Sequence, residues 1–163
     1  MLKIVSLDPG VTTGYSLGII EDDVFLVSCD QEKFSHWHLW NLLLEVEPDM
    51  IICESFEFRS QARDGLELYS CELIGIVKMY HQKFFKPQLK MQTAATGKGH
   101  YNDAKLKKMD LYIPGKDHGR DALRHMLQWY TFGAGFQYNK KQPIMLARTE
   151  TILNKGEQIG TRS

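Results

Sequence analysis

A chain of 163 residues that is 43% hydrophobic and 25% charged has the length of one domain with a single substantial core. No apolar run approaches the roughly 20 residues that span a bilayer, and the N-terminus enters a strand pattern without a leader-like segment. We therefore expect no membrane span and a location in the cytoplasm of a bacterial or phage-infected cell. Cys29, Cys53 and Cys71 are too few and too scattered for a disulfide framework, so buried, reduced thiols are expected.

The net charge of zero hides a strong asymmetry along the chain. Residues 1–77 hold 4 Lys or Arg against 14 Asp or Glu, a net charge of −10. Residues 78–124 hold 11 against 4, a net +7, and residues 125–163 hold 5 against 2, a net +3. The basic stretch suits contact with nucleic-acid phosphates, but lysines on a solvated helix face produce the same pattern, so both interpretations stay open.

Five strands are predicted from hydrophobic periodicity. Residues 2–8 form a mostly apolar strand that stops at a Pro-Gly turn. Residues 14–20 and 24–29 continue it as an antiparallel meander around an acidic turn. Residues 50–54 and 88–92 are predicted as two further strands.

Four helices alternate with these strands. Ser35 is the expected N-cap of an amphipathic helix that Pro48 ends. A long helix is expected over residues 60–84, and two helices close the domain over residues 102–112 and 117–130. The order is βββαβαβαα, an α/β fold in which a mixed five-stranded sheet is flanked by helices. We expect this domain to span residues 1–132, and residues 133–163 to form a C-terminal extension that is flexible or becomes ordered on a partner.

Acidic residues stand at the ends of two predicted strands and near the start of the last helix. These residues are Asp8, Glu54 and Asp121. Carboxylates at one edge of a sheet can hold two divalent cations about 3.5 to 4 Å apart, the geometry of in-line phosphodiester hydrolysis. Mg²⁺ suits such hard oxygen ligands, with Mn²⁺ as a substitute. One ion would activate the attacking water and the other would stabilise the leaving oxygen.

Four segments carry a more specific pattern. LDPGVTTGYSL, residues 7–17, and ICESF, residues 52–56, each place an acid at the end of a strand. TGKGHYNDAKLKKM, residues 96–109, joins a GxG to a lysine-bearing helix, and DHGRDALRHML, residues 117–127, places a histidine three residues before an aspartate. Each segment alone is a weak signal, since a DPG turn is more often only a tight turn. Together, in this order and spacing, they resemble the RuvC family of Holliday junction resolvases in the RNase H-like superfamily, and its bacteriophage type in particular.

The resemblance implies a role for each acidic position. Asp8, Glu54 and Asp121 are expected to bind metal, with His118 as a fourth ligand or as a general base. Asp117 is the substitute ligand if His118 points away, although a helix N-cap is its ordinary role. The side chains expected to contact DNA are Phe56, Phe58, Lys98, Lys105, Lys107 and Lys108. The phenylalanines suit base stacking but also core packing, and the lysines suit phosphates but also a solvated face.

The function implied by the resemblance is endonucleolytic resolution of Holliday junctions and other branched DNA, with two metal ions per active site. Two symmetric cuts imply a homodimer, and the apolar surplus on the long helix, including Leu68, Ile74 and Ile76, suits an interface, although full burial gives the same pattern. Alternatives are RNase H-like cleavage of RNA:DNA hybrids and a non-catalytic branched-DNA-binding module. ATP-binding proteins of the actin and sugar-kinase type also place an aspartate and glycines after a strand, but they normally need two such domains, and 163 residues is too short for two. The tail after Phe132 and the extra Glu57 depart from the family pattern and leave substrate details open.

Overall fold

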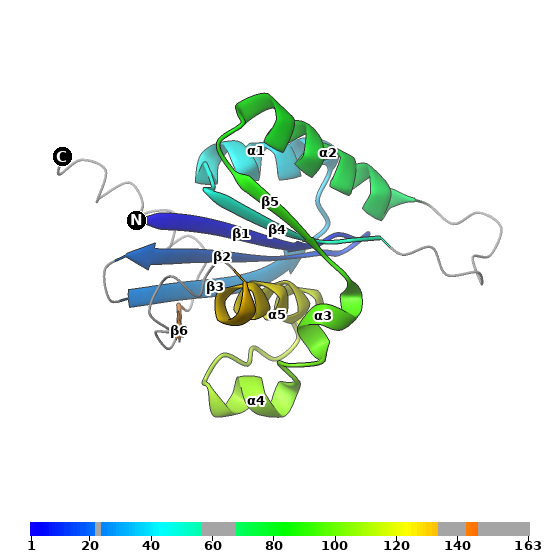
Figure 1. Cartoon of the computed structure of the whole chain (residues 1–163). Coiled ribbons are helices and arrows are strands. Elements are labelled where there is room, and N and C mark those ends of the chain that lie inside the picture. Colours follow the sequence, from blue (N-terminus) through cyan, green and yellow to red (C-terminus); the bar gives the residue numbers. More distant parts are fainter. Residues whose placement is uncertain (22–23, 57–67, 134–142, 147–163) are drawn as a thin grey trace.

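The computed structural model describes residues 1–21, 24–56, 68–133 and 143–146 of the chain. The fold is a mixed six-stranded sheet with the strand order β5-β4-β1-β2-β3-β6 and helices on both faces (Figure 1). The strands are β1 (Leu2–Asp8), β2 (Thr13–Glu21), β3 (Val24–Glu32), β4 (Met50–Glu54), β5 (Gln88–Gln92) and β6 (Pro143–Met145). The α/β class and the five expected strands are confirmed, and the short β6 is an addition that sequence periodicity did not reveal.

The sheet combines an antiparallel meander with parallel additions at its edges. β1 pairs antiparallel with β2, and β2 pairs antiparallel with β3. β4 joins β1 in parallel and β5 joins β4 in parallel, while β6 runs parallel to β3. β1 and β4 are parallel and pair Leu7 with Cys53. Asp8 and Glu54 directly follow these two residues, so both acids lie at the same edge of the sheet.

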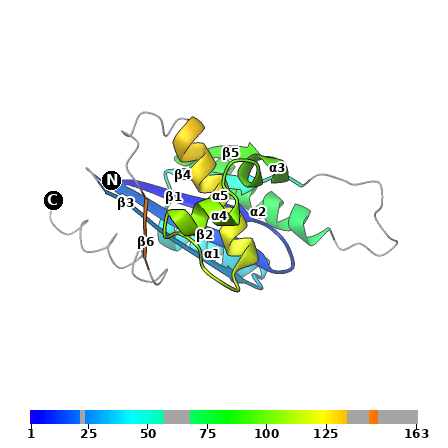
Figure 2. The same ribbon diagram turned by 90° about the horizontal axis from the view of Figure 1, so that it is seen from below.

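Helices cover the two faces separately. They are α1 (His36–Val46), α2 (Tyr69–Phe84), α3 (Ala94–Lys98), α4 (Asp103–Lys108) and α5 (Asp117–Phe132). Figure 1 shows α1 and α2 above the sheet and α3, α4 and α5 below it, and Figure 2 gives the view from the α4 and α5 side. None of the described helices is long and apolar enough to cross a membrane.

Helix boundaries differ from the expectations in instructive ways. Ser35 caps α1 as expected, its hydroxyl accepting a hydrogen bond from the backbone N–H of His38 at 3.2 Å. α2 begins at Tyr69, and residues 57–67, where the long helix was expected to begin, lie outside the described residues. The helix expected over 102–112 ends at Lys108, because Asp110 has a left-handed φ of 56° that a helix cannot continue through. α3 was not expected at all.

Two apolar cores lie on opposite faces of the sheet, which explains why the strands are nearly continuous apolar runs. Val5, Leu7 and Ile51 pack against α1 and α2, whereas Ile4 and Ile52 pack against α5. Successive side chains of a strand alternate between faces, so Asp8 follows Ile4 and Glu54 follows Ile52 on the α5 side. The alternation therefore fixes which helix can meet the two acids.

The cysteines are free, as expected for reduced thiols. Cys29 and Cys53 are buried in the sheet, whereas Cys71 in the first turn of α2 is only partly buried, contrary to the expectation of burial. Burial raises the pKa of the Cys29 thiol to about 12 and raises that of Cys53 as well, which keeps both in the unreactive thiol form. These thiols are packing residues of the sheet.

Candidate functional site

Three carboxylates converge where β1 and β4 end against α5. Asp8 and Glu54 close the two parallel strands, and Asp121 lies in the second turn of α5, which packs against both strands. Burial raises the pKa of Asp8, the hydrogen bond to His118 lowers it, and the nearby charges of Glu54 and Asp121 raise it again. The Asp8 side chain is 13% exposed, so this repulsion acts with little solvent screening. The structure therefore brings together the three acids that the sequence singled out.

Two histidines of α5 contact two of these carboxylates. Nδ1 of His118 lies 2.9 Å from Oδ2 of Asp8, so His118 points into the site as expected. Nε2 of His125 lies 2.9 Å from Oε2 of Glu54, and its Nδ1 lies 2.7 Å from Oε1 of Gln92. The His118 side chain is 49% exposed and that of His125 only 2%, so the two histidines differ in their freedom to move.

Asp121 is held by two cations. Nζ of Lys98 lies 2.7 Å from Oδ2 of Asp121, and Arg124 donates a hydrogen bond to Oδ1. The hydrogen bond to Asp121 raises the pKa of Lys98, burial lowers it, and the charges of the three acids raise it. Arg124 is buried and also donates to Asp103 at the start of α4 and, at 2.7 Å, to the carbonyl of Tyr101. Arg124 therefore links the segment that begins α4 to α5, and it also holds the carboxylate of Asp121.

Two glycines allow α5 to approach the sheet closely enough to form the site. A Cβ on Gly14 of β2 would lie 1.9 Å from the carbonyl oxygen of His118, and one on Gly119 would lie 2.6 Å from that of Asp30. Any side chain at either position would push the first turn of α5 away from the sheet. The backbone N–H of His118 also donates to Oε1 of Gln31 at 3.0 Å, which fixes the same turn.

The carboxylates suit a hard divalent cation by their chemistry. Within the described ranges no group of three or more His, Cys, Asp or Glu side chains forms a ready-made metal site, because each acid is turned toward a basic partner. Yet Asp8, Glu54 and Asp121 supply oxygen donors whose mutual repulsion a cation would relieve. Lys98, with a side chain 58% exposed, has room to withdraw from Asp121. The chemistry of these three donors therefore suits a hard divalent cation, provided that their basic partners give way.

Asp117 is not the helix N-cap that the sequence predicted. The N-cap of α5 is Lys116, so Asp117 is the first helical residue and not the cap. Its carboxylate pairs with Arg120, one turn along the helix, and is 80% exposed. It points away from Asp8, whereas His118 points toward it.

Phe56 lies beside the carboxylates, on the side of α2. It is 37% exposed and lines a cavity of about 170 Å³ together with Glu54, Pro9 and Ser70. The cavity thus opens directly next to one of the three acids. Phe58, its expected companion, lies outside the described residues.

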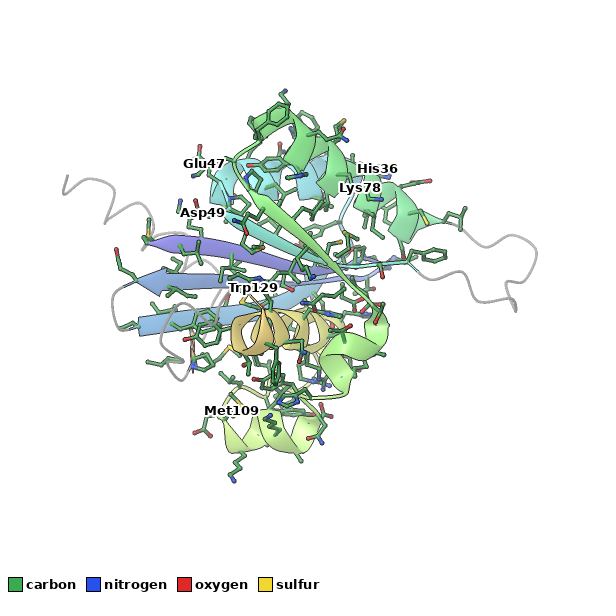
Figure 3. All side chains as sticks on the ribbon, in the orientation of Figure 1. His36, Glu47, Asp49, Lys78, Met109 and Trp129 are labelled. Carbon is green, nitrogen blue, oxygen red and sulfur yellow. The ribbon has the colours of Figure 1, made fainter. Side chains whose placement is uncertain are left out.

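The predicted basic stretch is not one surface. Arg120 and Arg124 are buried and ion-paired, so they act inside the fold. Figure 3 shows Lys78 on α2, on the opposite side of the sheet from Trp129 of α5. Lys98 lies next to the carboxylates, and Lys105, Lys107 and Lys108 lie on α4, on the α5 side of the sheet (Figure 1). Nζ of Lys105 lies 4.3 Å from the ring centroid of Tyr101, and Nζ of Lys107 lies 4.6 Å from that of Tyr112.

Sequence reasoning missed three residues of the site, His125, Gln92 and Arg124. The available signals were spacing and register. His125 follows Asp121 by four residues and so shares its helix face, and Gln92 ends β5 directly opposite Glu54 in the parallel pair. The spacing of His125 can be read from the sequence, whereas the pairing of Gln92 with Glu54 is visible only once the neighbouring strands are known.

Solved structures with the same fold are known, although no family model and no curated protein matches the sequence. Thermus thermophilus RuvC aligns with a TM-score of 0.61 and 16% identity, covering 84% of this chain and 98% of that protein. The same protein in complex with a Holliday junction substrate aligns with a TM-score of 0.60 and 15% identity, covering 80% of this chain and 95% of that one. The fowlpox virus Holliday junction resolvase aligns with a TM-score of 0.54 and 14% identity, covering 80% and 99%. The chain therefore has the RNase H-like fold of these resolvases, as the sequence motifs implied.

Proposed function

We propose that the protein is a divalent-metal-dependent endodeoxyribonuclease that resolves four-way junctions and other branched DNA. The observation that carries this proposal is the convergence of Asp8 and Glu54, at the ends of β1 and β4, with Asp121 of α5. Grouping partly buried acids that repel one another costs stability, and metal binding would offset this repulsion. The fold supports the choice of substrate, since similar structures are named as Holliday junction resolvases and one contains the junction itself.

In this proposal the chain supplies the ligands and the groups around them. Asp8, Glu54 and Asp121 would hold two Mg²⁺ ions, whose chemistry would be to activate the attacking water and to stabilise the leaving oxygen. His118 either completes the ligand set or accepts the proton of the attacking water, since its ring lies against Asp8 and remains half exposed. When DNA binds, the side chain of Lys98 moves from its ion pair with Asp121 to an ion pair with a phosphate oxygen.

Two regions near the carboxylates offer contacts for branched DNA. Lys105, Lys107 and Lys108 of α4 lie on the α5 side of the sheet and suit phosphates of the arms. Phe56 lines the cavity beside Glu54, where its exposed ring suits stacking on a base left unpaired at the branch point. Phosphate contacts would position the junction, and the ring would favour a branch over a linear duplex.

A homodimer belongs to the proposal, because two symmetric cuts need two active sites. α2 presents an outer apolar stripe with Leu68, its N-cap residue, and Met79, which are 46% and 49% exposed. Of the other residues expected at this interface, Ile74 is buried and Ile76 packs partly against the core, so neither belongs to the stripe. Gly75 on the same helix has open space around it, which permits close approach of a second copy. Burial of Leu73 and Val77 on the inner side leaves this stripe free for an interface.

Cleavage assays test the proposal. Wild-type protein should cut a four-way junction in Mg²⁺ and not in EDTA, and should act less well on linear duplex and RNA:DNA hybrid. Asp8→Asn and Asp121→Asn should abolish cleavage while junction binding persists. Asp110→Asn is a matched control, since Asp110 lies just beyond α4 with a left-handed φ that asparagine tolerates. Wild-type rates in the Asp8 or Asp121 variant would disprove the assignment, and preferential cleavage of the hybrid would favour an RNase H-like activity.

A further inference from the structure

His125 is a buried polar residue among core side chains of α5. It is 1% exposed, and its neighbours along α5, Leu123, Met126 and Leu127, are fully buried core residues. Burying an imidazole without hydrogen bonds costs free energy that a leucine here would not incur. A specific interaction therefore accounts for a histidine at this position better than packing does.

Both ring nitrogens of His125 have partners, and the partners are neighbours in the sheet. Glu54 and Gln92 are paired residues at the ends of the parallel strands β4 and β5, so both side chains extend toward α5. His125 bridges them, with Nε2 2.9 Å from Oε2 of Glu54 and Nδ1 2.7 Å from Oε1 of Gln92. Gln92 is itself buried, at 7% exposure, and its backbone carbonyl accepts a 2.7 Å hydrogen bond from the backbone N–H of Ser55. The bridge is thus anchored at its far end.

Nε2 of His125 donates to the carboxylate of Glu54 when that nitrogen carries the ring proton, so the donor role depends on the tautomer. A Gln92 amide turned with its nitrogen toward Nδ1 favours the tautomer that is protonated on Nε2.

The partners of the three carboxylates differ in whether they can leave. The side chains of His118 and Lys98 are 49% and 58% exposed, so both can swing aside when a cation arrives. The His125 side chain is 2% exposed and enclosed by the core, so it stays. A fixed donor that holds one carboxylate oxygen leaves the other oxygen oriented for a metal ion.

We propose that His125, anchored by Gln92, is a positioning residue that fixes the carboxylate of Glu54 for metal binding. This inference rests on the proposed function, because it assigns His125 a task only if Glu54 is a metal ligand. Partners of this kind change metal affinity or activity by about 10- to 100-fold when they are removed. His125 would therefore act on the metal dependence of the reaction and not on DNA binding.

The test measures Mg²⁺ binding without DNA, by the Mg²⁺ dependence of the melting temperature and by calorimetry, in wild-type protein and in variants. His125→Leu keeps the volume and removes the donor, and we expect Mg²⁺ affinity to fall about 10- to 100-fold. His125→Gln keeps an N–H near the position of Nε2 and should retain most of the affinity. His81→Leu is the matched control, because it removes a histidine whose Nδ1 lies 2.8 Å from the carbonyl of Pro87, far along the chain from the acids.

A cleavage titration provides the second measurement. In His125→Leu the Mg²⁺ concentration for half-maximal junction cleavage should rise by a similar factor, while junction binding in EDTA is unchanged. Unchanged Mg²⁺ affinity in this variant, or equal losses in His125→Leu and His125→Gln, would overturn the positioning role. If His125→Leu gives no cooperative melting transition, Gln92→Leu decides, since it frees the far end of the bridge and should weaken Mg²⁺ binding; unchanged binding overturns the role. Absence of any Mg²⁺ response in wild-type protein would instead refute the proposed function.

Discussion

At the scale of single residues, the carboxylate cluster places function in conflict with stability. Burial raises the pKa of Asp8 from its ordinary value of 3.8, and the charges of Glu54 and Asp121 add to this. The folded protein therefore binds the Asp8 proton more tightly than the unfolded chain does. The stability that this proton contributes is complete below the ordinary pKa and is lost as the pH rises through the raised one.

Asp8→Asn should consequently stabilise the metal-free protein at neutral pH. In EDTA at pH 7.5 we expect the free energy of unfolding to rise by about 0.5–2 kcal/mol, the usual range when a functional strain is removed. The advantage should shrink as the pH is lowered toward 4, where Asp8 of the wild type regains its proton. Denaturant unfolding at both pH values checks this, and a variant less stable than wild type at pH 7.5 would contradict the repulsion described here.

At the scale of elements, the approach of α5 to β2 decides whether the site forms. Gly14→Ala would place a methyl group 1.9 Å from the carbonyl oxygen of His118. We expect a loss of about 1–3 kcal/mol or more, as for other overpacked sites, together with loss of cleavage because His118 moves from Asp8. Gly75→Ala is the control, since nothing lies within 4 Å of its added carbon and the helical position should gain roughly 0.5–1 kcal/mol. Equal stability of the two variants in thermal unfolding would argue against a tight contact.

The lysines of α4 give a prediction about salt. Replacing Lys105 and Lys108 together with alanine should reduce the slope of log affinity against log salt for a four-way junction. Each lost phosphate contact is worth a slope of about 0.9. Lys78→Ala, on the opposite side of the sheet, should leave the slope unchanged (Figure 3). The measurement is junction binding in EDTA at several salt concentrations, and an unchanged slope in the double variant would make these lysines part of a solvated helix face.

At the scale of the whole molecule, the proposed dimer predicts a change in assembly. Leu68→Glu combined with Met79→Lys places charges at the two exposed positions of the outer stripe of α2 while the inner side keeps its core residues. We expect sedimentation to show a dimer for wild type and a monomer for the double variant. The monomer should still bind Mg²⁺ but should no longer cut both strands of a junction together. A monomeric wild-type protein would exclude this interface.

The amino-acid sequence by itself determined the strands, the main helices and the three acids. Strand alternation and the Pro-Gly turn depend on neighbouring residues only, so β1 to β5 and the positions of Asp8 and Glu54 could be predicted. The capping hydroxyl of Ser35 is local in the same way, and it predicted the start of α1 correctly. The net charge of the 78–124 segment was also visible, but not that two of its arginines lie inside the fold.

Only the tertiary structure decided what surrounds each acid. His125 is 71 residues from Glu54, and Gln92 is 33 residues from His125, so their contacts arise from the parallel β4-β5 pairing and the packing of α5. The contact of His118 with Asp8 depends on how closely α5 approaches Gly14. β6 likewise forms because the edge of β3 offers it hydrogen bonds, and a segment of three residues carries no periodicity from which a strand could be predicted. Long-range hydrogen bonds and close backbone approach leave no pattern among neighbouring residues of the sequence. These interactions determine how the three acids are arranged relative to one another.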